Sequence, residues 1–396
     1  MKRWISIPTA ILILFTSMTT TVADQVPIPP KGASLLETLN YYRLSSGLAP
    51  VVEDAQMTDG AQKHANYLAK TDTSFYVGEY ENLHKENPAS PYFSTEGTEF
   101  GAGNLTWSYG PFDNPIDGLM TAPFHAIGFL REGLAKVGFG TAVVQKNGYS
   151  PGSRVTNVAI ISGTQSVERT KILLFPGNNS TVYINDFAAE NPEPRETCGS
   201  DYKSFTGLPI FASLLDAPMD NLTASIRTPE GKVLSDKSDL CVVSEKTFKS
   251  SDSIYGPAGS AIIAGDHLVI LIPRKPLSIG AYDVMIKQPS QPDLSWRFTY
   301  ADALPKFENT VTVTYPRSNK IVYVGENVSF ELFSIEGKVS TLVSGSAFCS
   351  AYWRSSTLMV SGKKPGSCKV NISSSASKRI LAMKRTWTIS FQNRKK

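Results

Sequence analysis

Two histidines in the first third of the chain have the residue type and the surroundings needed for metal binding or proton transfer. His125 follows a short helical segment, in a turn of small residues, and His84 lies further upstream in a polar loop region. A neutral imidazole binds metal ions and exchanges protons near neutral pH. Two such rings from separate loops, framed by helices and a strand, are what a small cleft needs for either chemistry.

Carboxylates would have to complete any metal site, because two histidines alone hold Zn²⁺ poorly. Glu96 and Glu99 are the nearest candidates, judged by their position in the sequence alone. Together with His84 and His125 they could hold Zn²⁺ weakly and leave an open position for water. His64 lies on the apolar side of a predicted helix, where both a hydrogen-bonded core residue and a ligand remain open interpretations.

The predicted elements around the histidines indicate a mixed α/β unit. Apolar spacing predicts the first two helices, and Asn114 followed by Pro115 predicts the start of a third, short one. Between them, residues 71–109 show no sustained period, which is typical of a functional or only locally structured segment. Alternating residues predict two strands that pair as a hairpin across residues 148–152. The predicted helices and strands cover residues 34–46, 58–70, 136–144 and 157–162.

Beyond residue 164 or so the helical period disappears, and short alternating runs separated by turns take its place. These runs predict antiparallel β-sandwiches. A linker at residues 301–305 divides them, so two β units follow the α/β unit.

The N-terminus is typical of a secretory signal peptide at residues 1–23, with a basic start, an apolar core and small residues before the expected cleavage point. An uncleaved anchor is the alternative, but the apolar run is short for a membrane span, and no second run of that length follows. The net charge of +4 is mild and forms no Lys/Arg stripe, which argues against a nucleic-acid partner. We interpret the basic residues near the C-terminus as a solvated tail.

Four cysteines, all in the second half of the chain, predict disulfides in an exported protein. Three pairings are possible. The two-unit layout favours Cys198–Cys241 and Cys349–Cys368, because each bond then lies within one β unit. Zinc ligation is the alternative, although no C-x-x-C motif is present.

Several motifs between residues 33 and 165 are informative through their order and spacing. They are Leu39-Asn40-Tyr41-Tyr42-Arg43 with Gly47-Leu48-Ala49-Pro50, then Ala61-Gln62-Lys63-His64-Ala65, then Thr121-Ala122-Pro123-Phe124-His125, and finally Val137-Gly138-Phe139-Gly140. Together they resemble the CAP superfamily: cysteine-rich secretory proteins, antigen-5 proteins, pathogenesis-related proteins and their bacterial, SCP-like extracellular relatives. The resemblance implies a three-layer αβα sandwich with a central cleft.

In CAP proteins that cleft typically shows two histidines and two glutamates, which bind a divalent metal in some members. His125 matches the second family histidine, and His84 matches the first. The glutamates do not match: the family's G-E-N is Gly101-Ala102-Gly103-Asn104 here, and the helix before His125 carries only Asp117. The common arginine after the second histidine is Ala126. Two interpretations follow, a degenerate cleft kept as a scaffold and a metal site completed by Glu96 or Glu99.

The β region resembles bacterial immunoglobulin-like modules. The motifs are Pro276-Leu277-Ser278-Ile279-Gly280-Ala281-Tyr282-Asp283-Val284 with Trp296-Arg297-Phe298-Thr299, and Phe348-Cys349-Ser350 with Gly366-Ser367-Cys368-Lys369-Val370. We therefore expect a CAP-like αβα domain at residues 33–165 and two all-β immunoglobulin-like sandwiches at residues 170–301 and 306–393.

The expected function is that of a secreted or cell-surface bacterial protein. It would bind a ligand or a host or envelope component without catalysis. The alternative is a weakly metal-dependent hydrolase that uses His84 and His125 on peptides, nucleic acid or wall polymer. A carboxylate within ligand reach of both histidines would distinguish the two functions.

Overall fold

The computed structural model describes residues 26–30, 32–108, 114–146, 153–160, 169–202, 205–302, 307–308, 311–332, 339–354, 357–375, 380–381 and 383–394. The predicted signal peptide, the predicted hairpin turn at 148–152 and most of the linker between the β units lie outside these residues.

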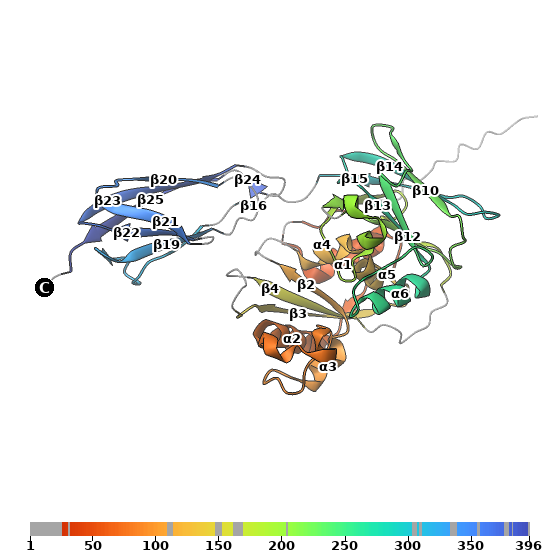
Figure 1. Ribbon diagram of the computed structural model, residues 1–396, viewed down its shortest axis with the longest axis horizontal. Coiled ribbons are helices and arrows are strands. Elements are labelled where there is room, and N and C mark those ends of the chain that lie inside the picture. The colour runs from red at the N-terminus through yellow and green to blue at the C-terminus, as the bar shows by residue number, and fades with distance from the viewer. Residues whose placement is uncertain are drawn as a thin grey trace, which may run out of the picture.

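The N-terminal unit is a three-layer αβα sandwich, as predicted (Figure 1). Its four-stranded sheet has the order β1-β3-β4-β2, with β1 parallel to β3 and the other neighbours antiparallel. Helices α2 and α3 cover one face, and α1, α4 and α5 cover the other. The bounds are α1 Leu35–Ser45, β1 Val52–Glu53, α2 Ala55–Lys70, α3 Thr95–Phe100, β2 Asn104–Ser108, α4 Pro115–Thr121, α5 Pro123–Leu130, β3 Lys136–Val143 and β4 Arg154–Ile160.

Glycine spacing explains how closely α2 packs on the sheet. Gly138 and Gly140 lie two residues apart in β3, so they face the same side of the sheet. A Cβ at Gly138 would lie 2.2 Å from the backbone of Met57, and one at Gly140 would lie 2.2 Å from that of Ala61. Only glycine permits this approach of strand to helix.

Arg43 stabilises the layer on the opposite face of the sheet by joining α1 to the C-terminal end of α5. Its side chain is fully buried, and its guanidinium donates hydrogen bonds to the carbonyls of Ala49, Phe129, Arg131 and Leu134. Most of these carbonyls lie at or just beyond the C-terminus of α5, where helix carbonyls lack partners and a positive charge is favourable. Burial lowers the pKa of Arg43 to about 10.

His125 is not in a turn, contrary to the sequence prediction. It belongs to the first turn of α5, which begins at Pro123 directly after α4 ends. The sequence from Pro123 to Leu130 is almost wholly apolar and lacks the periodicity of an amphipathic helix, so its pattern did not reveal a helix. Pro123 suits the first helical position, where its missing N–H is not needed.

The first β unit is a sandwich of two sheets with the orders β11-β10-β14-β15-β6 and β12-β13-β9-β5. Its first strand is divided: β5 pairs with β9 in one sheet, whereas β6 runs parallel to β15 in the other. The strands of the sandwich are β5 Leu173–Phe175, β6 Ser180–Val182, β9 Ile210–Ser213, β10 Thr223–Arg227, β11 Val233–Leu234, β12 Leu240–Ser244, β13 Leu268–Pro273, β14 Gly280–Lys287 and β15 Leu294–Tyr300.

Strand order and one side-chain contact make this sandwich immunoglobulin-like. The sheet β12-β13-β9-β5 reproduces the ABED arrangement of that fold. Tyr282, in β14, donates its hydroxyl hydrogen to the carbonyl of Ser278 at 2.9 Å, which is the tyrosine corner that accompanies the fold. Two insertions depart from the plain sandwich. One, before β9, carries β7 Asp186–Phe187 and β8 Thr206–Gly207, and the other, before β13, carries α6 Gly256–Gly265.

The second β unit has two four-stranded sheets of the same kind, β17-β19-β22-β21 and β18-β25-β23-β20. In addition, β16 pairs with β24. The bounds are β16 Phe307–Glu308, β17 Val311–Thr314, β18 Val322–Tyr323, β19 Asn327–Leu332, β20 Val339–Ser344, β21 Cys349–Arg354, β22 Thr357–Gly362, β23 Gly366–Ser374, β24 Ile380–Leu381 and β25 Met383–Gln392.

The disulfide pairing predicted from the domain layout is confirmed. Cys198 is bonded to Cys241, and Cys349 to Cys368. The first bond joins the insertion before β9 to strand β12, and the second joins β21 to β23, which belong to opposite sheets. No cysteine of the described residues is left free.

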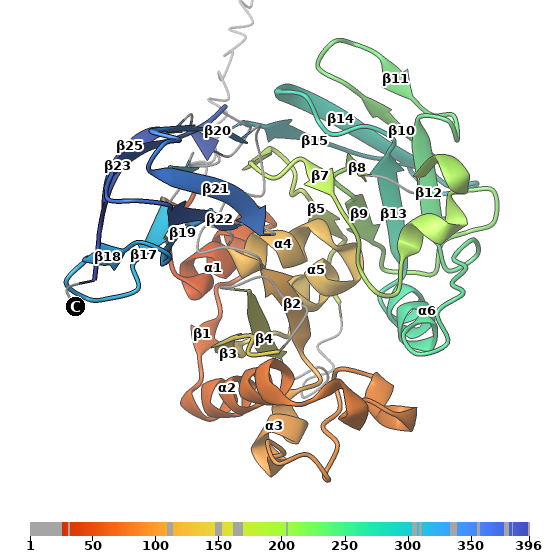
Figure 2. The ribbon, with the colours of Figure 1, turned by 60° about the vertical axis from the view of Figure 1, so that its left-hand side comes forward.

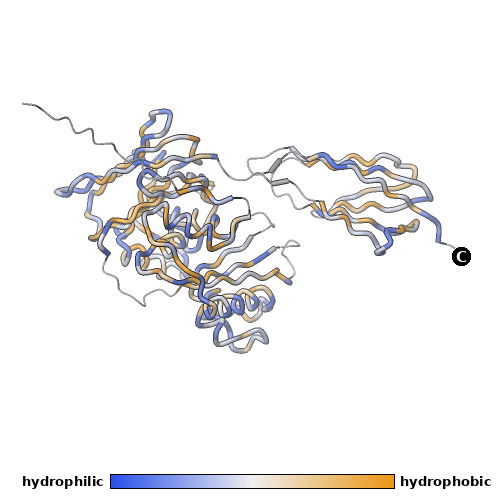
Figure 3. Tube along the Cα trace, turned by 180° about the vertical axis from the view of Figure 1, so that it is seen from behind, coloured by the Kyte–Doolittle hydropathy of each residue, from blue (hydrophilic) through white to orange (hydrophobic). Residues whose placement is uncertain are grey.

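The hydrophobic core does not follow the three-part division of the sequence. One continuous cluster of buried side chains runs from α1, α4 and α5 into the first sandwich, with Tyr42, Phe129 and Phe211 among its members. The second sandwich has a separate core around Phe330 and Val360. Figure 2 shows the first sandwich lying against the α1–α4–α5 face, and Figure 3 shows hydrophilic segments along the outer α2–α3 layer.

Candidate functional site

A buried carboxylate from the first sandwich meets His125. Oε2 of Glu190 lies 2.8 Å from Nδ1 of His125. The Glu190 side chain is 1% exposed and that of His125 is 16% exposed. Glu190 belongs to the insertion before β9, so the partner of His125 comes from 65 residues further along the chain. The contact orients the imidazole and leaves its other nitrogen, Nε2, free of this pairing.

The same carboxylate closes the N-terminus of α5. The helix has no side-chain cap of its own, since Ala122 occupies the cap position. The N–H of Phe124 lies 3.2 Å from Oε2 and 3.3 Å from Oε1 of Glu190. A negative charge at this end also interacts favourably with the helix dipole. Glu190 therefore caps the N-terminus of α5, a role that an Asp or Ser next to the helix in sequence normally has.

Burial dominates the electrostatics of Glu190. Removal from water raises the pKa of its carboxyl group, while the hydrogen bonds from His125 and Phe124 act in the opposite direction. A carboxylate can remain in such a place only because donors surround it.

His84 lies in different surroundings. Its Nδ1–H donates to the carbonyl of Gly101 at 3.0 Å, which assigns the proton to that nitrogen in the neutral ring. Burial lowers the pKa of His84 to about 4, and positive charge on His125 and His64 acts in the same direction. The ring of Tyr255 packs edge-on against the His84 ring, with centroids 6.1 Å apart. His84 is therefore neutral over the physiological pH range.

His64 is a core residue, one of the two interpretations that the sequence left open. Its ring is fully buried, with Nδ1 2.9 Å from Oε1 of Glu86 and Nε2 3.0 Å from the carbonyl of Leu83. The Nε2–H donates to the carbonyl of Leu83, and the other ring nitrogen faces the carboxylate of Glu86. Glu86 also accepts the N–H of Ser94. The group fastens the loop that carries His84 to α2.

The two insertions of the sandwich act together beside these histidines. Ser251 donates its N–H and hydroxyl to Glu196, at 2.5 and 2.9 Å, so the second insertion binds the first. Tyr255, which precedes α6, accepts the N–H of Leu83 at 2.9 Å. The Cys198–Cys241 bond ties the first insertion to the sandwich. Both insertions thus lie against the histidine-bearing part of the N-terminal unit.

The structure does not bring Glu96 and Glu99 to the histidines. Both are exposed on α3, because that helix turns Gly97 and Phe100 inward. Glu96 lies 3.4 Å from the Lys63 ammonium instead. Across the described part of the chain, no three His, Cys, Asp or Glu side chains gather where they could hold a metal ion. Tight zinc binding needs three or four protein ligands, so these residues do not fit a tight zinc site.

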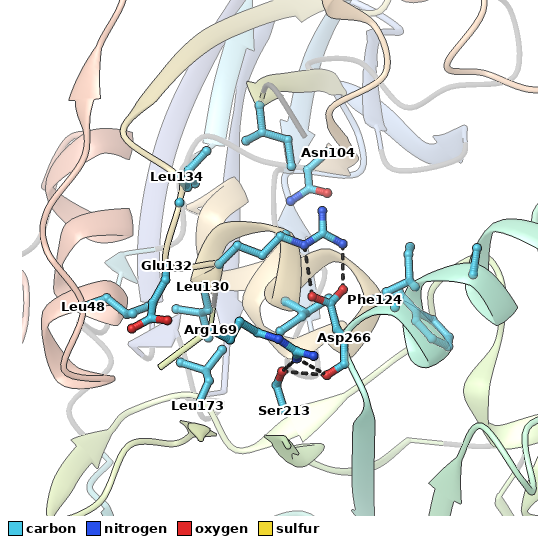
Figure 4. A pocket seen from close by; sticks show the side chains of 18 of the residues that line it. Leu48, Asn104, Phe124, Leu130, Glu132, Leu134, Arg169, Leu173, Ser213 and Asp266 are labelled. Carbon is cyan, nitrogen blue, oxygen red and sulfur yellow. Dashed lines mark hydrogen bonds and ion pairs between the residues drawn. The ribbon is translucent and has the colours of Figure 1, made fainter. Parts of the chain in front are cut away.

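Beside the histidines, a pocket of about 620 Å³ opens between α5 and α6. Neither His84 nor His125 lines it, although Phe124, next to His125, does. Figure 4 shows Arg169 beside Ser213 and Asp266 in its wall. Pockets of this size hold small organic ligands in other proteins. The apolar side chains of its wall include Leu48, Phe124, Ile127, Leu130, Leu173 and Ile262.

Comparison with known proteins agrees with this geometry. Residues 36–160 match the family model of the CAP, or cysteine-rich secretory protein, family. The N-terminal unit of the chain therefore belongs to the CAP superfamily. No curated protein sequence matches the chain.

Similarity to solved structures is weak. The Ig1-2 module of the Drosophila receptor tyrosine phosphatase DLAR is 11% identical with a TM-score of 0.17, over 46% of this chain and 89% of that one. The fibronectin(III)-like modules of Clostridium thermocellum CbhA are 12% identical with a TM-score of 0.17, over 47% of this chain and 85% of that one. Scores this low carry no argument, so the immunoglobulin-like description rests on strand order and the tyrosine corner.

Sequence reasoning missed Glu190, Tyr255 and Glu86, the residues that partner the three N-terminal histidines or their loops. Glu190 lies in a stretch rich in acidic residues and proline that shows neither helical nor strand period. Its role depends on how two units pack, which no local pattern reports. Glu86 lies two residues from His84, but its contact with His64 arises only when the loop folds back onto α2.

Proposed function

We propose that this chain is an extracellular, non-catalytic binding protein whose CAP unit and first sandwich form one ligand-binding body. The predicted signal peptide and the two disulfides support an oxidising compartment outside the cytoplasm. None of the helices in the described part of the chain has the length and hydrophobicity of a membrane span.

The observation that carries the proposal is the use of the cleft's polar groups in joining the two units. Glu190 holds Nδ1 of His125 and the N-terminus of α5. His84 gives its Nδ1–H to Gly101 and packs against Tyr255. These contacts support a structural role for the histidines, and the pocket between α5 and α6 lies beside His125, whose neighbour Phe124 lines it. A preformed, mostly apolar pocket at a unit boundary is a usual place for ligand binding.

The experiment compares binding with turnover in the same preparation. The protein is purified from the medium of a secreting host, and bound small molecules are extracted and identified by mass spectrometry. Hydrolysis of peptide, nucleic-acid and wall-polymer substrates is measured with and without Zn²⁺, for the wild type and for His125→Ala. We expect a bound or titratable small molecule and no hydrolysis that depends on His125. Zinc-dependent turnover that His125→Ala abolishes would overturn the proposal and favour a hydrolase.

A further inference from the structure

We infer that the pocket between α5 and α6 binds an amphipathic organic anion, with its apolar body in the pocket and its anionic group at Arg169. This inference rests on the proposed binding function and names the chemical class of the ligand. The site is formed jointly by the CAP unit and the sandwich, and Phe124, the neighbour of His125, lines it.

The apolar side chains of the pocket wall favour a ligand whose main part is apolar. Phe124, Ile127 and Leu130 face it from α5, and Leu173 and Ile262 face it from the sandwich. At roughly 30 Å³ per water, the volume of about 620 Å³ corresponds to about twenty waters. Displacing water from walls of this kind contributes roughly 25 cal/mol per Å² of apolar surface buried. A ligand with a long hydrocarbon chain or a fused ring system would gain most.

The charged side chains in the pocket wall favour a ligand with an anionic group. Asp266 is already neutralised, because Arg131 lies 2.7 Å from its carboxylate. In its contacts with the described residues, Arg169 donates from Nη1 alone, to the hydroxyl of Ser213 at 2.6 Å and to the carbonyl of Asp266 at 2.7 Å. Both acceptors are uncharged, so nothing in these contacts balances the guanidinium charge. Its Nε and Nη2 are left for an incoming carboxylate, sulfate or phosphate oxygen.

Two further side chains adjust this balance. Lys171 adds a second cation, whose only acceptor in the described contacts is the carbonyl of Gly47 at 2.6 Å. Glu132 is the remaining acid of the lining, and in Figure 4 its carboxylate lies on the Leu48 side, away from the Arg169 guanidinium. Asp266 is paired with Arg131, and Lys171 and Glu132 carry opposite charges, so Arg169 leaves one net positive charge in the lining.

The test uses the purified full chain and three probes that share one alkyl chain: dodecanoate, dodecanol and dodecyltrimethylammonium, each as a monomer below its micelle concentration. Isothermal calorimetry measures affinity and stoichiometry. We expect one dodecanoate per chain, with dodecanol at least about tenfold weaker and the ammonium probe weaker still, because a hydrogen-bonded charge contributes about 1.5–3 kcal/mol.

Three variants locate the site. Arg169→Gln should weaken dodecanoate by about tenfold or more and leave dodecanol unchanged, whereas the matched change Lys249→Gln, on an exposed lysine outside the pocket, should change neither. Gly265→Trp should abolish binding of both probes, because a Cβ at Gly265 meets no atom within 4 Å and the indole can occupy the pocket. Should Arg169→Gln fail to fold, the exposed Lys171→Gln replaces it in the charge test.

Two results would overturn the inference. Equal affinity for dodecanoate and dodecanol, or no effect of the charge variant, would show that the pocket does not select an anionic ligand. Binding that survives Gly265→Trp would show that the ligand does not bind in this pocket. If the extracted ligand proves neutral or cationic, the inference fails while the binding function stands; if no small molecule is extracted and no probe binds, both fail.

Discussion

His84 and His125 are the same residue type, but they lie in different surroundings. His84 faces a neutral carbonyl and an aromatic ring, and burial lowers its pKa to about 4. His125 faces the buried carboxylate of Glu190 at 2.8 Å. A pair of imidazoles with such different surroundings does not act as two equivalent ligands.

The lowered pKa of His84 predicts a loss of stability in acid. The unfolded chain takes up the proton near pH 6.5, but the folded chain does not do so until about pH 4. The unfolded state therefore binds more protons between these values, and the free energy of unfolding falls by about 3 kcal/mol as the pH drops through that window. The asparagine in His84→Asn can still donate to Gly101 but does not titrate.

Urea unfolding of the wild type and of His84→Asn at pH 7.5, 5.5 and 4.0 measures this loss. We expect the difference in unfolding free energy between the two proteins to change in favour of the variant as the pH falls. Glu190, whose raised pKa acts with the opposite sign, is present in both proteins and largely cancels. Parallel pH profiles would show that His84 is not buried as described.

At the scale of elements, the central relation is between α5 and the insertion that carries Glu190. The helix lacks a local cap, and in the described residues of the insertion the regular structure consists of short strands and 3₁₀ turns. Each element supplies what the other needs, an acceptor for the N–H of Phe124 and donors for a buried carboxylate.

Removing this carboxylate should therefore destabilise both elements. Glu190→Ala should lower the free energy of unfolding by about 3 kcal/mol, because a buried charged pair loses one partner. Glu190→Gln keeps an acceptor for the helix and should lose about 1 kcal/mol. Glu96→Ala, at an exposed carboxylate, is the control and should change stability by less than about 0.5 kcal/mol.

A double-mutant cycle with His125→Ala isolates the pairwise contact, with an expected coupling of about 1–2 kcal/mol. A loss in Glu190→Ala no larger than that in Glu96→Ala would mean that the insertion does not contact α5 in solution.

For the whole molecule, we expect the number of unfolding transitions to follow the continuity of the core and not the number of modules in the sequence. Helices α1, α4 and α5 share one core with the first sandwich, whereas the second sandwich has its own. Calorimetry of the full chain should show two transitions, and a chain ending at residue 302 should retain one of them at an unchanged temperature. A single transition lost on truncation would show that the two cores depend on each other.

Helices and strands such as α2 and β3, and the two sandwiches, could be predicted because their residues carry local periods and turn signals. The αβα layering was predicted from the resemblance to the CAP superfamily. Strand β21 carries no such signal, because Tyr352 and Trp353 are adjacent and both exposed. The disulfides followed from the domain layout. The surroundings of the cleft could not be predicted, since Glu190 reaches His125 only through the packing of two units that the sequence presents as separate modules.

The Glu190 contact also limits how this chain can be recombined. A CAP unit from another protein, grafted in front of this sandwich without a histidine at position 125, would leave a buried carboxylate facing no base. The reverse graft would leave α5 without its cap. The CAP unit and the first sandwich can therefore be transferred to another protein only together. The second sandwich has its own core and disulfide, so it can be replaced independently.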